Sequence, residues 1–232
     1  MRNPVAGHHC TVDIDRTHAV VVGAGPGLGA GIARRFAREG FALTLVARSA
    51  GTLAPLAGEL RAAGTDVDVV TADVADPAAL AAALAPVAAA LPGVVVYNVG
   101  LVVADDLLVD PPEHFTHALA VDVVGAVAVA QLFTPAMRAA GAGTFLVTGG
   151  GPALHPDPAH ASLTLGKAAL RNAVAVLHEQ LAADGVHAAG VTVVGVVEPG
   201  TPLDPDRIAE TYWELHREPR GSWSVDRVVD GS

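Results

Sequence analysis

Four glycines lie close together near the start of the chain, directly after a run of β-branched residues. They are Gly23, Gly25, Gly27 and Gly29 in the stretch GAGPGLGAG, with Leu28 among them. Glycines are needed where a tight turn lets the backbone approach a pyrophosphate, whose charge then rests on the N-terminus of the following helix. Because a strand pattern precedes the turn and a helix pattern follows it, the sequence predicts a dinucleotide-binding site here.

The next strand pattern ends in LVARS, where an NAD-binding site usually carries a carboxylate for the ribose 2′-hydroxyl. Arg48 stands there instead, and its guanidinium suits a 2′-phosphate through charge-assisted hydrogen bonds. Ser49 offers a further hydroxyl. A solvated surface arginine is the alternative, but the pattern favours NADP(H) as the cofactor.

The segments that would position these residues alternate between β-branched runs and alanine-rich stretches. Strands are expected at 18–23, 42–47, 67–71, 93–98, 143–148 and 190–197. Helices are expected over 27–39, 50–63, 76–91, 111–140 and 158–184. A last helix over 205–217 and a short strand within 222–229 follow. These repeated βαβ units predict an α/β fold, a Rossmann-type doubly wound parallel sheet of about seven strands flanked by helices.

The length and composition predict one domain. The chain has 232 residues, of which 51% are hydrophobic, enough for one substantial core. Residues 1–16 are polar and are expected to form a loose leader before a single domain over 17–232. The formal charge of −10 disfavours nucleic acid and anionic membranes as partners. No apolar run is typical of a membrane span or a signal peptide, which predicts a cytoplasmic protein.

The cysteine and histidine content points to no metal site. Cys10 is the single cysteine, so no internal disulfide can form, which fits a reducing compartment. The ten histidines include His8 and His9 in the leader. None of their pairs has the HExxH type of spacing that sets two zinc ligands on one helical face.

Further motifs follow the glycine turn in order, and together they resemble those of the short-chain dehydrogenase/reductase family. The matching pieces are the GxxxGxG turn; ADV with Asp73 and Val74; YNVG with Asn98, Val99 and Gly100; Lys167; and EPG with Pro199 and Gly200. The resemblance runs over nearly the whole chain from His18 onward. It implies that Asp73 contacts the adenine, that Lys167 holds the nicotinamide ribose, and that the Pro-Gly pair lies beside the nicotinamide.

The resemblance also implies a serine, a tyrosine and a helical asparagine around the lysine, and the chain departs from all three. Leu163 in SLTLGK stands at the tyrosine position, Gly150 near the serine position and Asp122 at the asparagine position. The family tyrosine exchanges a proton with the substrate oxygen, which the serine hydrogen-bonds. Losing a general acid costs about 10²- to 10⁴-fold in rate, so the usual route to carbonyl reduction is weakened.

Other side chains are candidates for the missing proton donor. Helical spacing places residues 160, 163, 164 and 167 on one face, so His160 and Thr164 flank the vacant position. Imidazole suits proton transfer at neutral pH, although His160 can equally be a partly exposed helix-start residue. Thr148 ends the fifth strand beside the glycines. The candidate catalytic residues are Lys167, His160, Thr148 and Asp122.

The region after the Pro-Gly pair is where the family places a variable substrate lid. Tyr212, Trp213 and Trp223 are concentrated there and either cover a ligand or pack on the core. The resemblance further implies a homodimer or homotetramer that pairs through the helices at 111–140 and 158–184.

Three functions remain open at this point. The first is an atypical NADP-dependent oxidoreductase of an unidentified small molecule, with a changed proton donor. The second is a non-redox enzyme of the isomerase or cyclase type on the same fold. The third is a nucleotide-binding pseudoenzyme. The retained cofactor motifs and Lys167 favour the first.

Overall fold

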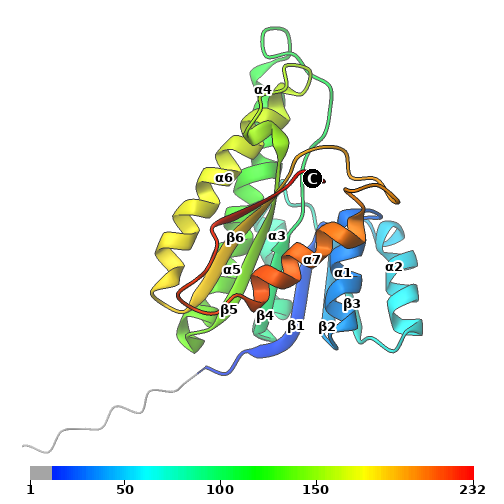
Figure 1. The fold of residues 1–232 in the computed structure, drawn as a ribbon, viewed down its shortest axis with the longest axis vertical. Coiled ribbons are helices and arrows are strands. Elements are labelled where there is room, and N and C mark those ends of the chain that lie inside the picture. The colour runs from blue at the N-terminus through cyan, green and yellow to red at the C-terminus, as the bar shows by residue number, and fades with distance from the viewer. Residues whose placement is uncertain (1–11) are drawn as a thin grey trace, which may run out of the picture.

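Seven parallel strands form one sheet, in the order β3-β2-β1-β4-β5-β6-β7 (Figure 1). The computed structural model describes residues 12–232; the predictions for Cys10, His8 and His9 and for most of the leader lie outside them. The strands are β1 Asp15–Val22, β2 Ala42–Ala47, β3 Val67–Thr71, β4 Pro92–Tyr97, β5 Gly143–Gly150, β6 Val186–Val193 and β7 Asp226–Val229. The predicted Rossmann-type fold is confirmed, and its strand order reverses between β1 and β4.

Helices cover both faces of the sheet, because the central strands are apolar on both sides. They are α1 Leu28–Arg38, α2 Ala50–Ala62, α3 Pro77–Ala89, α4 Pro112–Leu119, α5 Gly125–Ala140, α6 Ala161–Ala182 and α7 Pro205–Arg217. One buried cluster joins α1, α2 and α7 to the sheet through Phe36, Leu53 and Tyr212. The other joins α3, α5 and α6 to the opposite face through Leu84, Phe133 and Leu170.

The aromatic residues of the C-terminal region pack against other parts of the fold. Tyr212 is fully buried, and Trp213 packs edge-on against Phe36 and Phe41. Trp223 stacks on His187 at the opposite end of the sheet from the glycine turn, with a centroid distance of 5.0 Å. Of the two alternatives for these residues, the structure therefore favours packing over a lid.

The sixth strand begins and ends four residues earlier than the expected 190–197. β6 is Val186–Val193 and is buried along its whole length. Its first half holds His187 and small residues, which have weak strand signals. The His187 ring is accommodated because both of its nitrogens lie within 3.0 Å of backbone carbonyl oxygens, those of Leu215 and Ser224. The first strand also differs, since β1 begins at Asp15, within the expected leader.

The long helix expected over 111–140 is interrupted. A π-helical turn, Ala120–Val124, separates α4 from α5. The run Pro112–Ala140 is long and apolar enough to cross a membrane, with a mean hydropathy of 1.7, but half of that window is buried inside the fold. It packs against α3 and α6 as a core helix does.

The loop between β4 and α4 is tied to the start of α6. Asp105 N donates to Ala159 O at 3.1 Å, and the Asp105 carboxylate accepts from Ser162 N at 3.1 Å and from His114 Nε2 at 2.7 Å. Burial raises the pKa of Asp105, but the hydrogen bonds from Ser162 and His114 outweigh it and lower that pKa to about 2. Asp105 thus caps α6, whose own N-cap residue contributes no side-chain bond.

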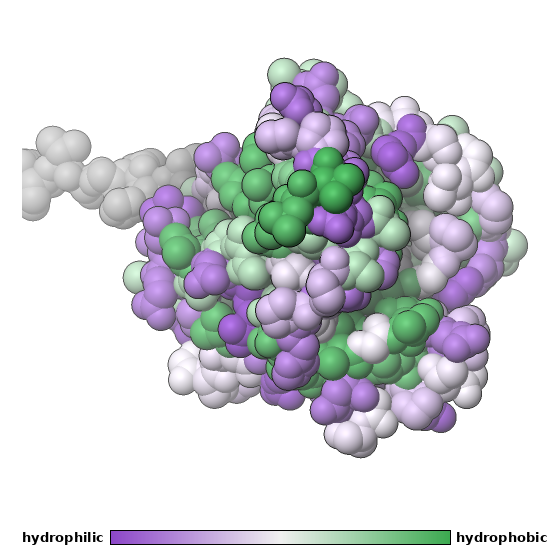
Figure 2. Space-filling model, turned by 90° about the horizontal axis from the view of Figure 1, so that it is seen from above, coloured by the Kyte–Doolittle hydropathy of each residue, from purple (hydrophilic) through white to green (hydrophobic). Residues whose placement is uncertain are grey.

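The tip of the same loop exposes apolar side chains. Leu107, Leu108 and Val109 are 57%, 94% and 78% exposed. Figure 2 looks onto this end of the molecule and shows apolar side chains gathered there beside hydrophilic ones.

Candidate functional site

The glycine turn joins β1 to α1 at the point where the strand order reverses. Gly23 has φ +88°, and a Cβ there would collide with Asn98 O. A Cβ on Gly29 would collide with Gly23 O and stand 2.9 Å from the Ala24 Cα. These two glycines are therefore required by packing. At Gly25 and Gly27, in contrast, a Cβ would meet nothing within 4 Å, so both leave an open cradle above the turn.

The N-terminus of α1 opens onto this cradle. The helix begins at Leu28 with Gly27 as its N-cap residue, and no side chain caps it. The first N–H groups of a helix lack intrahelical partners and carry partial positive charge, so they attract an anion such as a phosphate. The open cradle and the uncapped helix fit the pyrophosphate of a dinucleotide.

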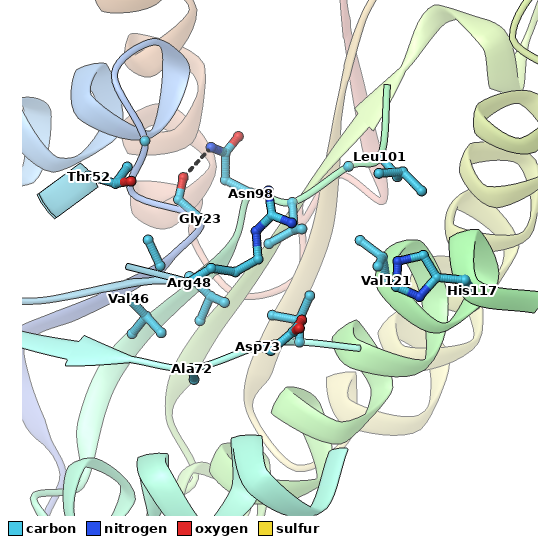
Figure 3. Close-up of a pocket in the computed structure, with 16 residues that line it drawn as sticks. Gly23, Val46, Arg48, Thr52, Ala72, Asp73, Asn98, Leu101, His117 and Val121 are labelled. Atoms are coloured by element: carbon cyan, nitrogen blue, oxygen red, sulfur yellow. Dashed lines mark hydrogen bonds between the residues drawn. The ribbon is translucent and has the colours of Figure 1, made fainter. Parts of the chain in front are cut away.

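A cavity of about 320 Å³ extends from the turn across the carboxyl ends of β1 to β4, as far as the π-helical turn and α4 (Figure 3). Eight of the predicted cofactor residues line it: Gly23, Gly25, Arg48, Asp73, Val74, Asn98, Val99 and Gly100. The other lining residues are Val22, Val46, Ala47, Thr52, Ala72, Leu101, His117 and Val121.

Arg48 is exposed and forms no ion pair or side-chain hydrogen bond within residues 12–232. Figure 3 shows its side chain extending over the cavity between Gly23 and Asp73. Ser49, in contrast, is the N-cap of α2, where it accepts from Thr52 N at 3.3 Å and bonds the Thr52 hydroxyl at 2.8 Å. Of these two neighbours, Arg48 has the free donors.

Asn98 links the glycine turn to β5. Its Nδ2 donates to Gly23 O at 2.9 Å, and its Oδ1 accepts from the Thr148 hydroxyl at 2.7 Å. Because Thr148 gives its one proton to Asn98, Tyr212 donates to Thr148 across 2.6 Å. This series of hydrogen bonds fixes the wall of the cavity. It engages the hydroxyl of Thr148, which is one of the candidate proton donors.

The Pro-Gly pair does not line this cavity. Pro199 lies six residues beyond the end of β6, in a separate hollow with Pro26 and Gly27. Gly200 is exposed and donates its N–H to the carboxylate of Asp204 at 2.7 Å. The earlier end of β6 explains this placement, because the residues that directly follow the strand are Val194 and Gly195.

Lys167 lies on α6 beneath the cavity wall and is 5% exposed. Its Nζ donates to Val99 O at 2.8 Å and to Thr148 O at 3.1 Å. Asp122 Oδ1 lies 3.7 Å from the same nitrogen, and its side chain is fully buried. The structure therefore brings Lys167, Asp122 and the backbone of Thr148 together.

Burial shapes the ionisation of this pair. Burial lowers the pKa of Lys167, and the negative charge of Asp122 opposes this shift. Burial raises the pKa of Asp122, and the positive charge of Lys167 opposes that shift. Asp122 Oδ2 has no hydrogen-bond partner. It lies against Gly166, where an added Cβ would collide with that oxygen and stand 2.8 Å from the Asp122 Cβ. Gly166 makes room for the carboxylate.

Tyr97 holds the π-helical turn that carries Asp122. Its buried hydroxyl donates to Val121 O, one of the carbonyl groups in that turn. Burial raises the pKa of Tyr97 far above its usual value, so the phenol is neutral and acts as a donor. This bond fixes the backbone on either side of the carboxylate.

The remaining candidates lie apart from the cavity or carry no proton. His160 is the N-cap residue of α6, and its Nδ1 contacts Asp157 at 2.8 Å on a partly exposed loop. Leu163 is 9% exposed. At Gly150 the backbone is extended, and a Cβ would make ordinary contacts of 3.5 Å to Lys167 Cγ and Pro152 Cδ. Among residues 12–232 no three His, Cys, Asp or Glu side chains gather as a metal site would require.

Eight lining residues were not among the predicted site residues. Four of them, Val22, Val46, Ala47 and Ala72, lie at the ends of β1 to β3, and the other four are Thr52, Leu101, His117 and Val121. His117 and Val121 are four residues apart, so one helical face presents both to the cavity (Figure 3). The four-residue spacing of His117 and Val121 is visible in the sequence. The sequence does not show which face of the expected helix lies against the sheet.

The fold and the site together define a protein of the Rossmann-type α/β class: the cavity lies at the reversal of strand order, and its floor is a glycine turn that opens onto a helix N-terminus. The family model described as short chain dehydrogenase matches residues 17–207. The chain belongs to this family.

Several known proteins are similar to it. The 3-dehydrosphinganine reductase TSC10A of Arabidopsis thaliana is 30% identical over 129 residues, which are 55% of this chain and 39% of that protein. A metagenomic short-chain oxidoreductase in complex with NADP is 26% identical, with a TM-score of 0.83 over 93% of this chain and 97% of that one. An alcohol dehydrogenase from Thermococcus sibiricus, complexed with 5-hydroxy-NADP, is 28% identical, with a TM-score of 0.82 over 92% and 96%.

Proposed function

We propose that this chain is an NADP(H)-dependent oxidoreductase that reduces a carbonyl group of a small organic molecule. The observation that carries the proposal is the free guanidinium of Arg48 over a cavity floored by the glycine turn. The two similar structures bound to NADP or its 5-hydroxy derivative support it. So does the reductase relative, although the chain spans only 39% of its length.

The residues divide the work of binding. The open cradle at Gly25 and Gly27 and the start of α1 would hold the pyrophosphate, and Arg48 would pair with the 2′-phosphate. Asp73 and Val74 would border the adenine side, and Val99 and Gly100 the nicotinamide side. The bound nicotinamide supplies a hydride.

Titration of NADPH and NADH by fluorescence tests the assignment. Arg48→Asp should weaken NADPH binding by about ten- to a hundredfold, since hydrogen bonds to charged groups contribute roughly 1.5–3 kcal/mol, and should change NADH binding little. Arg207→Asp makes the same charge change at an exposed arginine outside the cavity and should affect neither. Equal losses for both nucleotides would overturn the cofactor assignment, and no binding of either would overturn the function.

A second candidate is a nucleotide-binding protein without hydride transfer. Leu163 and Gly150 favour it, because neither side chain donates a proton to a substrate oxygen. NADPH turnover with a broad panel of ketones and aldehydes separates the two. Tight binding without turnover on the whole panel selects the second candidate.

We also propose that the chain assembles as a homodimer or homotetramer through α5 and α6. Val124, which precedes α5, and Leu165 and Val176 on α6 are exposed apolar residues, at 46%, 42% and 54%. Light scattering at micromolar concentration should give a multiple of the 23.3 kDa chain mass. A monomeric mass would refute the assembly.

A further inference from the structure

Most of the hydroxyl and imidazole groups near the site are already engaged. The Thr148 hydroxyl donates to Asn98, and the buried Tyr212 hydroxyl is directed to Thr148. The Tyr97 hydroxyl donates to Val121 O. His160 is held by Asp157 on the outer loop. His117 on α4 lines the cavity and its imidazole forms no hydrogen bond or ion pair within residues 12–232, and Lys167 is a second group beside the same wall, next to Gly100.

The ammonium group of Lys167 retains one donor. It has three N–H bonds, of which two meet Val99 O and Thr148 O at 2.8 and 3.1 Å. The third faces no acceptor at hydrogen-bond distance, because Asp122 Oδ1 lies at 3.7 Å. Asp122 is the charged group within ion-pair distance of Nζ in the described chain.

Two glycines beside Lys167 place no side chain over it. A Cβ on Gly100 would stand 3.0 Å from Nζ, and one on Gly150 would stand 3.5 Å from Cγ. Gly100 also lines the cavity. Nζ thus lies directly behind the backbone of the cavity wall, and Gly150 leaves free the space that a serine side chain would take.

We propose that Lys167 donates the proton to the substrate oxygen during reduction, and that Asp122 is the residue that positions it and balances its charge. This inference rests on the proposed reductase function. As the carbonyl carbon receives the hydride of the reduced nicotinamide, an Nζ–H bond breaks and an O–H bond forms on the carbonyl oxygen. The lysine is left as a neutral amine and regains its proton from water.

The surroundings of the amine suit this role. Burial lowers the pKa of Lys167, which makes the ammonium a stronger acid than an exposed lysine. The Asp122 carboxylate acts in the opposite direction and favours the protonated form. Gly166 admits that carboxylate, so Asp122, Gly166 and Lys167 act as one unit.

The pH dependence of kcat tests the assignment in the full chain. If Lys167 is the acid, kcat falls on the alkaline side as the amine loses its proton. Asp122→Asn removes the charge that stabilises the ammonium and should move this limb to lower pH by about one unit or more. Asp105→Asn removes another buried carboxylate near α6, without contact to Nζ, and should leave the limb in place. Carbon-13 NMR of the lysine Cε, without nucleotide, should show the same shift of the amine pKa in Asp122→Asn.

A second variant separates charge from proton transfer. Lys167→Arg keeps a cation, but arginine does not release a proton at neutral pH. It should lower kcat by about 10²- to 10⁴-fold, with NADPH affinity within about threefold in the fluorescence titration. An alkaline limb that stays fixed in Asp122→Asn while the NMR pKa moves would overturn the role of Lys167 and leave the reductase function intact. A wild-type chain that turns over no carbonyl compound would overturn both.

Discussion

Gly166→Ala tests whether the buried carboxylate is packed as tightly as the contacts indicate. A Cβ at this position would stand 2.8 Å from the Asp122 Cβ and 2.9 Å from its Cγ. Carbon atoms in favourable contact are about 3.5–4.0 Å apart. Asp122 cannot retreat easily, because the Tyr97 bond to Val121 O holds its π-helical turn. The alanine must therefore displace the carboxylate or shift α6.

Overpacking of this kind costs typically about 1–3 kcal/mol. For a chain of this size, about 2 kcal/mol should lower Tm by roughly 4–8 °C. Calorimetry or circular dichroism measures the change. Gly58→Ala is the matched control: Gly58 lies within α2, and a Cβ there would meet nothing within 4 Å. Alanine should stabilise that exposed helix position by about 0.5–1 kcal/mol, so the two substitutions have opposite signs.

The contribution of Asp122 is isolated by a double-mutant cycle. In an Asp122→Ala background the carboxylate is absent, and Gly166→Ala should cost at least 1 kcal/mol less than in the wild type. If Gly166→Ala instead raises Tm as Gly58→Ala does, the close packing of Asp122 on α6 is wrong. The argument that Gly166 exists to admit the carboxylate then fails with it.

Two further predictions concern the pH dependence of stability and the residues Leu163 and Gly150. Burial lowers the pKa of His216 to about 4, whereas in the unfolded chain the imidazole titrates near 6.5. Below about pH 6.5 the unfolded state therefore binds a proton that the folded state does not. The stability that the neutral His216 contributes is complete above that pH and should fall by roughly 3 kcal/mol as the pH drops to 4. His216→Gln should flatten the Tm profile in that window, and an unchanged slope would contradict the shift. Leu163→Tyr with Gly150→Ser should raise ketone reduction about a hundredfold by supplying a hydroxyl acid, because a Cβ at Gly150 makes only ordinary contacts. Leu163→Phe with Gly150→Ser is the control, and an equal gain in it would exclude the hydroxyl as the cause.

Local patterns predicted those elements whose signals are complete within a few residues. β2, β3 and α7 have the bounds expected from the sequence. The start of α7 follows from Asp204 and Pro205, since the Asp204 side chain accepts from Asp206 N as an N-cap should. The predicted bounds of β6 were wrong because His187, without its hydrogen-bond partners, is a poor strand residue. Its partners Leu215 and Ser224 lie 28 and 37 residues away.

The candidate site divides in the same way. The glycine turn could be predicted, because its strand, turn and helix are contiguous in the sequence. The hydrogen bonding of each proton donor could not be predicted, because it depends on residues far away in the sequence. Thr148 is hydrogen-bonded to Asn98 and Tyr212, which lie 50 and 64 residues away. The separation of Pro199 from the cavity likewise depends on where β6 ends.

The residues Asp122, Gly166 and Lys167 are physically coupled. A buried ammonium is costly without a counter-charge, and removing one partner of a buried pair destabilises a protein by about 3–5 kcal/mol. Asp122 supplies that charge, and its carboxylate needs the space that Gly166 leaves. Asp122 Oδ2 has no hydrogen-bond partner, so the attraction to Lys167 and one hydrogen bond from Leu101 N to Oδ1 at 3.3 Å are what offset the burial of the carboxylate. A change at any of the three residues must therefore alter the environment of the other two.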